Sequence, residues 1–375
     1  MKVSLLFENL SKKILFVNHA VSARSQLPIL LNFLIEARSG KLSISATDLE
    51  IGISADIPAK IEEDGRITVP AKTLTELTMA TPLNKILLET KPEGLFLTGE
   101  KVKTVFQTTP ADEFPKLYEE KGKEAIILKK ENIKDLTKVV FAASQDSERP
   151  ALSGILIKEQ EDGFLLVATD GYRLSLKKNA LGKKEKHKEE EAINVIVPSR
   201  VIRELILMGK EGDGENISVY SSSEKNQIIF SGSDITLVGR LIEAEFPNYE
   251  KIIPEEYSTK TVFLREDLQK AVKASYVFAR QTANIVKLSI KKEMIVVSAN
   301  APSVGESTIE VDAKTTGEEN EIAFNARYLL DFFSNIAEEE VSFEMAGPLN
   351  PGVFKIVGDD SFLHLIMPIR VQAQA

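Results

Sequence analysis

The segment from Thr169 to Arg173 is the strongest candidate in this sequence for polar side chains that could do chemistry. It reads Thr-Asp-Gly-Tyr-Arg, and an aspartate in such a loop could act as a general base. A related pattern, Thr-Asp-Leu-Glu, runs from Thr47 to Glu50. An aspartate that recurs in this way is better explained as a turn residue, because Asp side chains hydrogen-bond to nearby backbone in turns. The segment therefore predicts a structural turn.

The remaining candidates for catalysis are no stronger. His19, His187 and His364 stand in unrelated contexts, a first helix, a charged loop and a terminal strand. The sequence contains neither a nucleophile elbow nor an H-E-x-x-H motif. The glycines at 209–214 lack the Lys-Ser/Thr of a phosphate loop, so we interpret them as a turn. The chain has no cysteine, which excludes disulfides and thiolate metal sites. We expect no enzyme, no metal and no cofactor.

Lysine and arginine are the residues whose spacing carries a chemical signal. Three amphipathic helical segments oppose an apolar face with basic residues, least cleanly in the first segment. Lys134 and Lys138 mark the second segment, and Lys270, Lys273 and Arg280 mark the third. One basic helix face is usually only a solvated face, but its recurrence favours a function. Such cations, without base-reading companions, would contact phosphates and ignore base sequence.

The elements that position these residues recur in the same order three times. The landmarks are small-residue turns after Ala46, Ala168 and Ala299, helix caps at Pro70, Pro198 and Asn325, and closing prolines at Pro115, Pro247 and Pro368. Units of roughly 125 residues are far longer than solenoid repeats, so each unit should be a domain with its own core. We expect three domains, at residues 1–122, 125–255 and 259–375.

Each repeat is predicted to be α+β, with two helices packed on antiparallel sheets of about eight short strands. Proline and asparagine suit helix starts, so second helices are expected near 71–79, 199–208 and 326–335. Linkers are expected near 119–124 and 255–260. The tract at 183–191 has no apolar residue and is interpreted as a solvated loop.

Bulk properties limit the function only loosely. The net charge of −9 argues weakly against a nucleic-acid partner, because charges beyond about 8–10 Å are largely screened. No apolar run approaches the about 20 residues that span a bilayer, and the amino terminus lacks a signal-peptide pattern. We therefore expect a cytoplasmic location.

Four short motifs make the sequence resemble the bacterial DNA polymerase III β subunit family, the sliding clamps, over essentially its whole length. The motifs are Ala168–Leu174, Glu245–Tyr249, Met367–Arg370, and Arg24 followed by Leu27–Leu30. The resemblance implies a head-to-tail homodimeric ring of six similar domains, with helices around a central hole and sheets on the rim. It implies a protein that encircles duplex DNA without sequence specificity and tethers the replicative polymerase for processivity.

The resemblance assigns the basic faces to the lining of the hole. The implied DNA-lining residues are Arg24, Lys134, Lys138, Arg149, Arg200, Arg203, Lys270, Lys273 and Arg280. A closed ring holds DNA topologically, so tight electrostatic binding is unnecessary. An acidic exterior would also keep DNA off the outside.

The resemblance further implies a hydrophobic pocket between the second and third domains that takes short peptides. The implied pocket residues are Leu152, Thr169, Gly171, Tyr172, Arg173, Leu174, Pro247, Ile252, Leu365, Ile366, Met367, Pro368, Ile369 and Arg370. Met367 is expected at the floor, with Arg173 and Arg370 at the rim. By sequence alone, the run from Leu365 to Met367 is better explained as a terminal core strand. The apolar run beside Pro368 and Arg370 at the chain end favours the pocket. The implied partners are the replicative polymerase α subunit, the clamp loader, repair polymerases and mismatch-repair proteins.

Two residues depart from the family pattern. Tyr172 stands where many clamps have histidine, and Lys251 where arginine is common, so both affect the polar rim of the pocket. The five residues 371–375 extend past the usual end and are expected to form a disordered tail.

Two other classes of protein remain open. A hydrolase or transferase on this scaffold would need a nucleophile and base. A scaffold protein that binds only proteins would lack a basic lining. For the clamp, we expect a dimer that joins the first domain of one chain to the third domain of the other, with sheet edges meeting.

Overall fold

The computed structural model describes residues 1–375 except 23, 39, 82, 119–123, 147, 162, 181–192, 212–215, 223–225 and 371–375. The expected charged loop, the expected tail and most of the first linker lie outside the described residues. The chain forms two compact units, which are described separately. Unit 1 holds residues 1–133 and 203–241, and unit 2 holds 134–202 and 242–375. Because this division passes through the second sequence repeat, the three domain bounds stay a prediction.

Within the described residues, each sequence repeat contributes two α-helices. They are α1 (Phe7–Val17), α2 (Ala71–Ala80), α3 (Lys130–Val140), α4 (Ser199–Glu211), α5 (Arg265–Ala279) and α6 (Ala326–Asn335). The predicted second helices at α2, α4 and α6 are confirmed. The Asn325 side chain accepts a hydrogen bond from the Arg327 amide at 3.0 Å, which caps α6. His19 lies just beyond α1, in the short helix η1 (Asn18–Ala20), so its expected place in the first helix was wrong.

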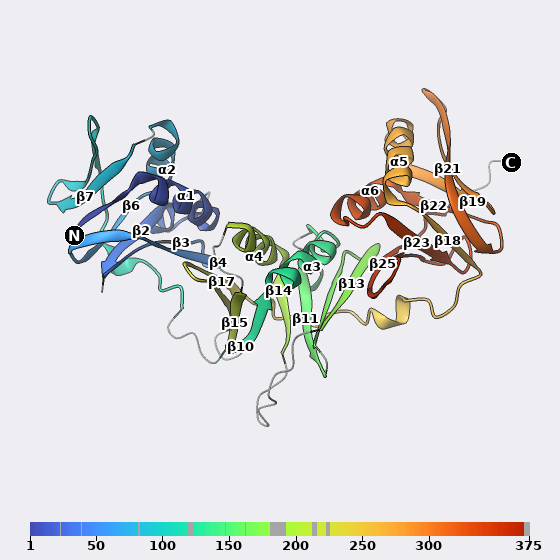
Figure 1. Ribbon diagram of the computed structural model, residues 1–375, viewed down its shortest axis with the longest axis horizontal. Coiled ribbons are helices and arrows are strands. Elements are labelled where there is room, and N and C mark those ends of the chain that lie inside the picture. Colours follow the sequence, from blue (N-terminus) through green and yellow to red (C-terminus); the bar gives the residue numbers. More distant parts are fainter. Residues whose placement is uncertain are drawn as a thin grey trace. The chain divides into compact units, whose positions relative to one another are not determined.

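Unit 1 contains two antiparallel sheets. Their strands are β1 (Lys2–Leu6), β2 (Asn32–Arg38), β3 (Lys41–Thr47), β4 (Ile51–Ile57), β5 (Ala59–Glu63), β6 (Gly65–Pro70), β7 (Lys85–Lys91), β8 (Gly94–Thr98), β9 (Lys103–Phe106), β10 (Glu124–Lys129), β15 (Asn216–Ser222), β16 (Gln227–Ser231) and β17 (Ile235–Arg240). One sheet has the order β5-β1-β7-β8-β9, and the other has the order β10-β15-β16-β17-β4-β3-β2-β6. Helix α1 packs on β3, β4 and α2 (Figure 1).

Unit 2 is built on one twelve-stranded antiparallel sheet. Its strands are β11 (Gly154–Gln160), β12 (Gly163–Thr169), β13 (Arg173–Ala180), β14 (Asn194–Pro198), β18 (Thr259–Leu264), β19 (Ile285–Ile290), β20 (Met294–Ala301), β21 (Gly305–Gly317), β22 (Asn320–Asn325), β23 (Glu340–Met345), β24 (Gly352–Ile356) and β25 (Asp359–Ile366). Their order is β14-β11-β12-β13-β25-β24-β23-β18-β21-β20-β19-β22. Helices α5 and α6 pack on each other, and α5 also covers β20 and β21. Phenylalanines 324, 332, 333, 343 and 354 fill the core beneath them.

Two strand pairings join different sequence repeats, and we call them the repeat seams. In unit 1, β17 of the second repeat pairs with β4 of the first, with Leu237 opposite Ile53. In unit 2, β13 of the second repeat pairs with β25 of the third, with Ser175 opposite His364. Each seam extends a sheet from one repeat into the next, so main-chain hydrogen bonds connect the repeats.

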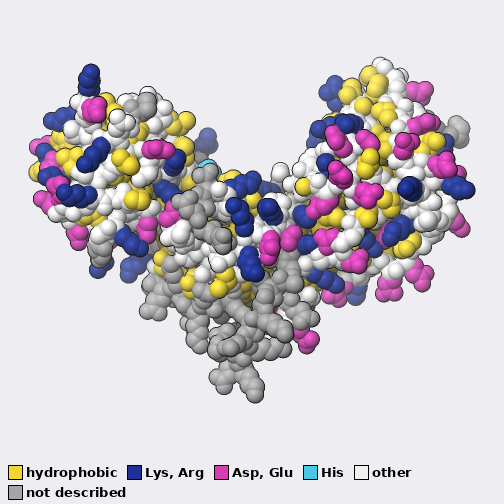
Figure 2. Space-filling view, in the orientation of Figure 1, with side chains coloured by type: hydrophobic (Ala, Val, Ile, Leu, Met, Phe, Trp, Pro, Cys, Tyr) yellow, Lys and Arg dark blue, Asp and Glu magenta, His cyan; other side chains and the backbone are white. Residues whose placement is uncertain are grey.

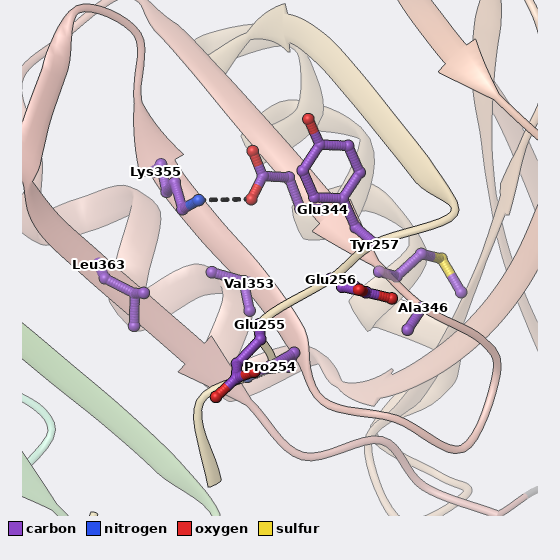
Figure 3. Close-up of a pocket in the computed structure, with 10 residues that line it drawn as sticks. Pro254, Glu255, Glu256, Tyr257, Glu344, Ala346, Val353, Lys355 and Leu363 are labelled. Atoms are coloured by element: carbon purple, nitrogen blue, oxygen red, sulfur yellow. Dashed lines mark hydrogen bonds and ion pairs between the residues drawn. The ribbon is translucent and has the colours of Figure 1, made fainter. Parts of the chain in front are cut away.

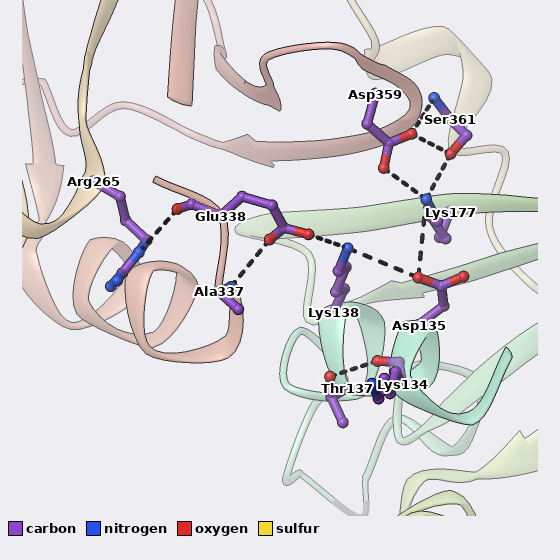
Figure 4. Close-up of polar contacts among 10 residues, drawn as sticks. All are labelled: Lys134, Asp135, Thr137, Lys138, Lys177, Arg265, Ala337, Glu338, Asp359 and Ser361. Atoms are coloured by element: carbon purple, nitrogen blue, oxygen red, sulfur yellow. Dashed lines mark hydrogen bonds and ion pairs between the residues drawn. The ribbon is translucent and has the colours of Figure 1, made fainter. Parts of the chain in front are cut away.

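Charged side chains reinforce the seam of unit 2 (Figure 4). The Lys177 Nζ on β13 lies 2.7 Å from Asp359 Oδ2 and 2.6 Å from Ser361 Oγ, both on β25. The Lys138 Nζ on α3 lies 2.6 Å from Glu338 Oε1, which precedes β23. Burial alone would raise the pKa of Asp359, but hydrogen bonds from Lys177 and Ser361 outweigh it and hold that pKa below its usual value. Removing one partner of a buried pair leaves the other charge uncompensated, so the loss of either member of these pairs should destabilise the seam.

His364 is a buried polar residue at this seam with a ring nitrogen left unsatisfied within the described part of the chain. It is 0% exposed, its Nδ1 lies 2.7 Å from Ser175 Oγ, and its ring stacks on Phe332 at 4.9 Å. Its Nε2 is buried with no hydrogen-bond partner among the described residues. Burial, together with the nearby Arg173 charge, holds the pKa of His364 well below its usual value. The imidazole is therefore neutral in the folded chain near pH 7.

His364 should make the protein less stable as the pH falls. The unfolded chain binds a proton at an ordinary histidine pKa of about 6.5, whereas the folded chain does not, so the free energy of unfolding decreases below that pH. His364→Phe removes this proton uptake and should flatten the pH dependence of urea midpoints between about pH 6.5 and pH 5. Equal slopes for the variant and the parent protein would show that His364 is not responsible.

Candidate functional site

The Thr169–Arg173 segment is a turn, as predicted. The Asp170 Oδ1 accepts hydrogen bonds from the backbone amides two and three residues ahead, at 2.9 and 3.0 Å. The Asp48 Oδ1 does the same in the first repeat, at 3.1 and 2.9 Å. Thr169 and Thr47 also donate from their hydroxyls to the carbonyl four residues on. Both aspartates thus accept backbone hydrogen bonds that stabilise the turn. This structural role explains why the residue recurs, without a catalytic role.

Arg173 is not at an exposed rim, and that expectation was wrong. The residue is 8% exposed. Its Nη1 lies 2.7 Å from Asp331 Oδ2, and its Nη2 donates to the Phe141 carbonyl at 2.9 Å. The guanidinium therefore forms these hydrogen bonds with groups inside unit 2.

The predicted pocket residues all belong to unit 2, and they separate by burial. Those that reach the surface at least partly are Leu152, Gly171, Tyr172, Pro247, Ile252, Met367, Pro368, Ile369 and Arg370, which we call the partner surface. Those that are buried are Thr169, Arg173, Leu174, Leu365 and Ile366. Leu365 and Ile366 form the end of β25, as the core-strand interpretation had it, and they support the partner surface from beneath.

The two sides of the partner surface are tied by main chain. The Met367 amide donates to the Tyr172 carbonyl at 2.8 Å, and the Ile369 amide donates to the Ala323 carbonyl at 2.8 Å. Met367 itself is 37% exposed, so its side chain lies at the surface. Large apolar side chains held open to solvent beside one another suit a protein-binding surface.

A small cavity lies between residues 254–257 and the sheet of β23, β24 and β25 (Figure 3). Its buried acid, Glu344, accepts a hydrogen bond from Lys355 and lies 3.0 Å from Lys260. Burial alone would raise the pKa of Glu344, but the two lysines outweigh it and hold that pKa below its usual value. A carboxylate kept ionised in this way is a poor general acid.

Most of the expected DNA-lining cations are exposed to solvent. The exposed ones are Arg24, Lys134, Arg149, Arg200, Arg203, Lys270, Lys273 and Arg280. Lys270 is the most clearly paired of them, with its Nζ 3.0 Å from Glu266 Oε1 one helical turn away. Such a solvent-exposed pair contributes little to stability, so a phosphate could replace the carboxylate. Figure 2 shows basic and acidic side chains interspersed over the visible face of unit 2 around α5 and α6.

Lys138 does not present a free cation, and that expectation was wrong. Its side chain is 15% exposed and binds Glu338, with Asp135 at 3.8 Å (Figure 4). Burial raises the pKa of Asp135 against the opposing effect of Lys177 and Lys138. Lys138 belongs to the seam network.

Two further cations occupy positions equivalent to Arg200 and were missed. Arg200 is the second residue of α4, and Lys72 and Arg327 are the second residues of α2 and α6. Both are exposed. The aligned helix caps contained this signal, since each of the three caps is followed two residues later by a basic residue.

Triplicated α+β repeats, joined edge to edge through their sheets and carrying basic helices, define the class of clamp-type proteins. The family models for the DNA polymerase III beta subunit match residues 1–118 (N-terminal domain), 127–248 (central domain) and 250–370 (C-terminal domain). The chain belongs to the DNA polymerase III β subunit family. As a member it is a DNA sliding clamp, a processivity factor that acts with a DNA polymerase.

Relatives and solved structures agree with this family over the full length. A beta sliding clamp of Synechococcus elongatus is 31% identical, with 100% of both chains covered. The DNA polymerase sliding clamp of Bacillus subtilis superposes with a TM-score of 0.92 at 26% identity, covering 99% of this chain and 100% of the other. The β subunit from Thermotoga maritima gives a TM-score of 0.90 at 27% identity, with the same coverage.

Among the described residues, no helix is both long and apolar enough to cross a membrane. The same residues contain no group of three or more His, Asp or Glu side chains placed to hold a metal ion.

Charge reversal on α5 tests the DNA contact. Lys270→Glu combined with Lys273→Glu should weaken binding to duplex DNA, because both phosphate contacts and the counterion release that accompanies them are lost. Each lost contact should also make the negative slope of log affinity against log salt less steep by about 0.9. The difference from the parent protein should grow as salt falls, in fluorescence anisotropy titrations. Lys291→Glu with Lys292→Glu, exposed between β19 and β20, changes the net charge equally and should have little effect. Equal losses in the two double variants would make the effect one of net charge alone.

Proposed function

We propose that two copies of this chain close head to tail into a ring around duplex DNA, and that partner proteins dock on the partner surface by short peptides. The observation that carries this proposal is the pair of repeat seams. In both seams, the strand after the Asp turn of one repeat pairs with the last strand of the following repeat. The first repeat has a last strand, and the third repeat a strand after the equivalent turn, that take part in neither seam. Family membership supports the ring and the polymerase partnership.

The two seams define which edges a second copy would join. Each seam pairs the strand after the Asp turn or its equivalent (β4, β13) with the last strand of the following repeat (β17, β25). The equivalent strands left over are the first half of β21 in the third repeat and β9 in the first. In the described chain, β9 ends its sheet, and Gly305–Asp312 of β21 pairs only with β20. A heterologous pair of edges closes into a ring when the rotation fits.

The internal repetition also supplies a register for that contact. In the hairpin before β17, four residues separate the last paired residues, Ser231 and Thr236. In the hairpin before β9, four residues likewise separate Thr98 and Lys103. Lys103 is therefore equivalent to Thr236, and Thr104 to Leu237. Ala46 faces Ile53 across its hairpin as Ala299 faces Ser307, which makes Ser307 equivalent to Ile53. Since Leu237 pairs with Ile53, Thr104 of one chain should pair with Ser307 of the other.

Charge and exposure along the two edges fit this pairing. Lys101, just before β9, and Lys103, its first residue, are exposed, and Glu306 and Glu310 are exposed on β21. Opposite charges across strands stabilise a pairing, whereas like charges oppose it. Val105 is also exposed, and an apolar edge residue of that kind is normally covered.

The chain has no cysteine, so an engineered disulfide can test the register directly. Thr104→Cys with Ser307→Cys should form an intermolecular disulfide on mild oxidation, because directly opposed residues lie within the ~4.4–6.8 Å Cα separation that a disulfide needs. Light scattering should give twice the chain mass of 41.5 kDa before oxidation. Rings oxidised around a circular DNA should resist high salt and be released when the DNA is cut.

A matched control is two residues out of register. Thr104→Cys with Ile309→Cys puts the sulfurs on diagonal positions, with Cα atoms roughly 7–8 Å apart, and should cross-link poorly. Equal cross-linking of both variants would refute the register, and a stable single-chain mass at micromolar concentration would refute the dimer.

The named partners belong to the same proposal. We infer that the replicative polymerase α subunit, the clamp loader, repair polymerases and mismatch-repair proteins each insert a short peptide at the partner surface. Flexible Met and Ile side chains there support the acceptance of several sequences. We further infer that the chain has no catalytic activity of its own and works in the cytoplasm with the replication machinery.

Met367 separates a binding role from a core role. Met367→Ala should lower the affinity for a polymerase-derived clamp-binding peptide by at least about fivefold, which corresponds to roughly 1 kcal/mol at a contact residue. The melting temperature should change little, because the side chain is already partly exposed. Leu349→Ala, exposed elsewhere in unit 2, is the control and should change neither quantity. A large loss of melting temperature with intact peptide affinity would assign Met367 to the core.

A further inference from the structure

Arg173 is enclosed on every side by groups from unit 2. Its Nε donates to Asp170 Oδ2 at 3.1 Å, its Nη1 to Asp331 Oδ2 at 2.7 Å and its Nη2 to the Phe141 carbonyl at 2.9 Å. The guanidinium carbon lies 4.7 Å from the Tyr328 ring centroid and 5.6 Å from that of Phe141. Three hydrogen bonds and two aromatic faces satisfy a buried cation. Arg173 therefore has little left to offer a peptide.

The contacts of Arg173 connect two sequence repeats. Asp170 belongs to the turn of the second repeat, whereas Tyr328 and Asp331 lie on α6 of the third repeat. The turn carries Tyr172, whose carbonyl accepts the Met367 amide at 2.8 Å. The position of Tyr172 against Met367, on the partner surface, is thus set through Arg173 as well as through the strand pairing.

The first repeat shows that the turn itself does not need this arginine. Ile51 stands at the equivalent position, directly after the Asp48 turn. The Asp48 Oδ1 nevertheless makes the same two backbone hydrogen bonds, at 3.1 and 2.9 Å. The arginine therefore contributes contacts between the turn and α6, and the turn's internal folding does not depend on it.

We propose that Arg173 is a positioning residue for the partner surface, and that it acts through Asp331 and Asp170 without contacting the bound peptide. This inference rests on the proposed function of the partner surface. Arg173 holds the turn that carries Tyr172 against α6. This keeps Tyr172 and Met367 in their relative positions before a peptide binds. A surface prepared in this way loses less conformational entropy when it binds.

Asp331→Asn is the sharpest test, because it keeps the side-chain volume, weakens the ion pair and leaves Arg173 in place. The Asp331 side chain is 50% exposed, so the substitution should not unfold the protein. We expect the affinity for the polymerase-derived peptide to fall about three- to tenfold, of the order expected for a weakened charge-assisted hydrogen bond. Amide hydrogen exchange at residues 170–173 should accelerate, while the melting temperature stays close to that of the parent protein. Glu318→Gln, exposed on the same unit, should change neither affinity nor exchange.

The double variant separates positioning from direct contact. If Arg173 acts through Asp331, Arg173→Ala with Asp331→Asn should lose no more affinity than Arg173→Ala alone. If Arg173 instead contacts the peptide, Asp331→Asn frees the guanidinium and leaves affinity unchanged or raised, which would overturn the proposal. Should Arg173→Ala fail to fold, the affinity and the exchange rates of Asp331→Asn still decide.

Met367→Ala keeps this test distinct from that of the proposed function. If Met367→Ala leaves peptide affinity unchanged, the partner surface itself is misassigned. If Met367→Ala weakens binding and Asp331→Asn does not, the partner surface stands and the positioning role of Arg173 is refuted. Loss of affinity in both variants, with faster exchange only in Asp331→Asn, supports both.

Discussion

Antiparallel pairing across the repeat seams is the interaction on which the rest of this structure depends. A sheet edge is a row of unpaired backbone donors and acceptors, and an isolated repeat would expose two such rows. Pairing β4 with β17 and β13 with β25 covers these edges inside the chain. Main-chain hydrogen bonds place few demands on side chains, so the three repeats can differ widely in sequence and still join in the same way.

Side-chain charges are used in two different ways by this acidic chain. Lys138 and Lys177 are largely buried and paired with carboxylates at the seam of unit 2, where a lost partner would leave an uncompensated charge. Lys270 and Lys273 lie on the exposed face of α5, where ion pairs are weak and screened by salt. If these exposed cations line the path of the DNA, as proposed, weak and screened contacts of this kind would let a clamp move along it.

The sequence predicted the local features well and the long-range contacts poorly. Helix starts at Ala71, Ser199 and Ala326 follow from caps that a reader can see in a few adjacent residues. Lys138 and Arg173 were misjudged because their partners, Glu338 and Asp331, lie 200 and 158 positions away. Periodicity indicates that a side chain is on a polar face, but not which distant carboxylate will meet it there. The resemblance to a family suggested the residues of the partner surface, and the structure adds which of their side chains are exposed and which are buried beneath.

The turn that follows Thr47 and recurs after Thr169 has a consequence for how such a chain can diverge. Its hydrogen bonds are made by Thr and Asp, so the residue that follows is free to be Ile51 in one copy and Arg173 in another. Because the turn forms without help from that residue, the position can be substituted without loss of the turn. One repeat can therefore carry an arginine that binds a neighbouring helix while another keeps an apolar residue there, and the same turn forms in both.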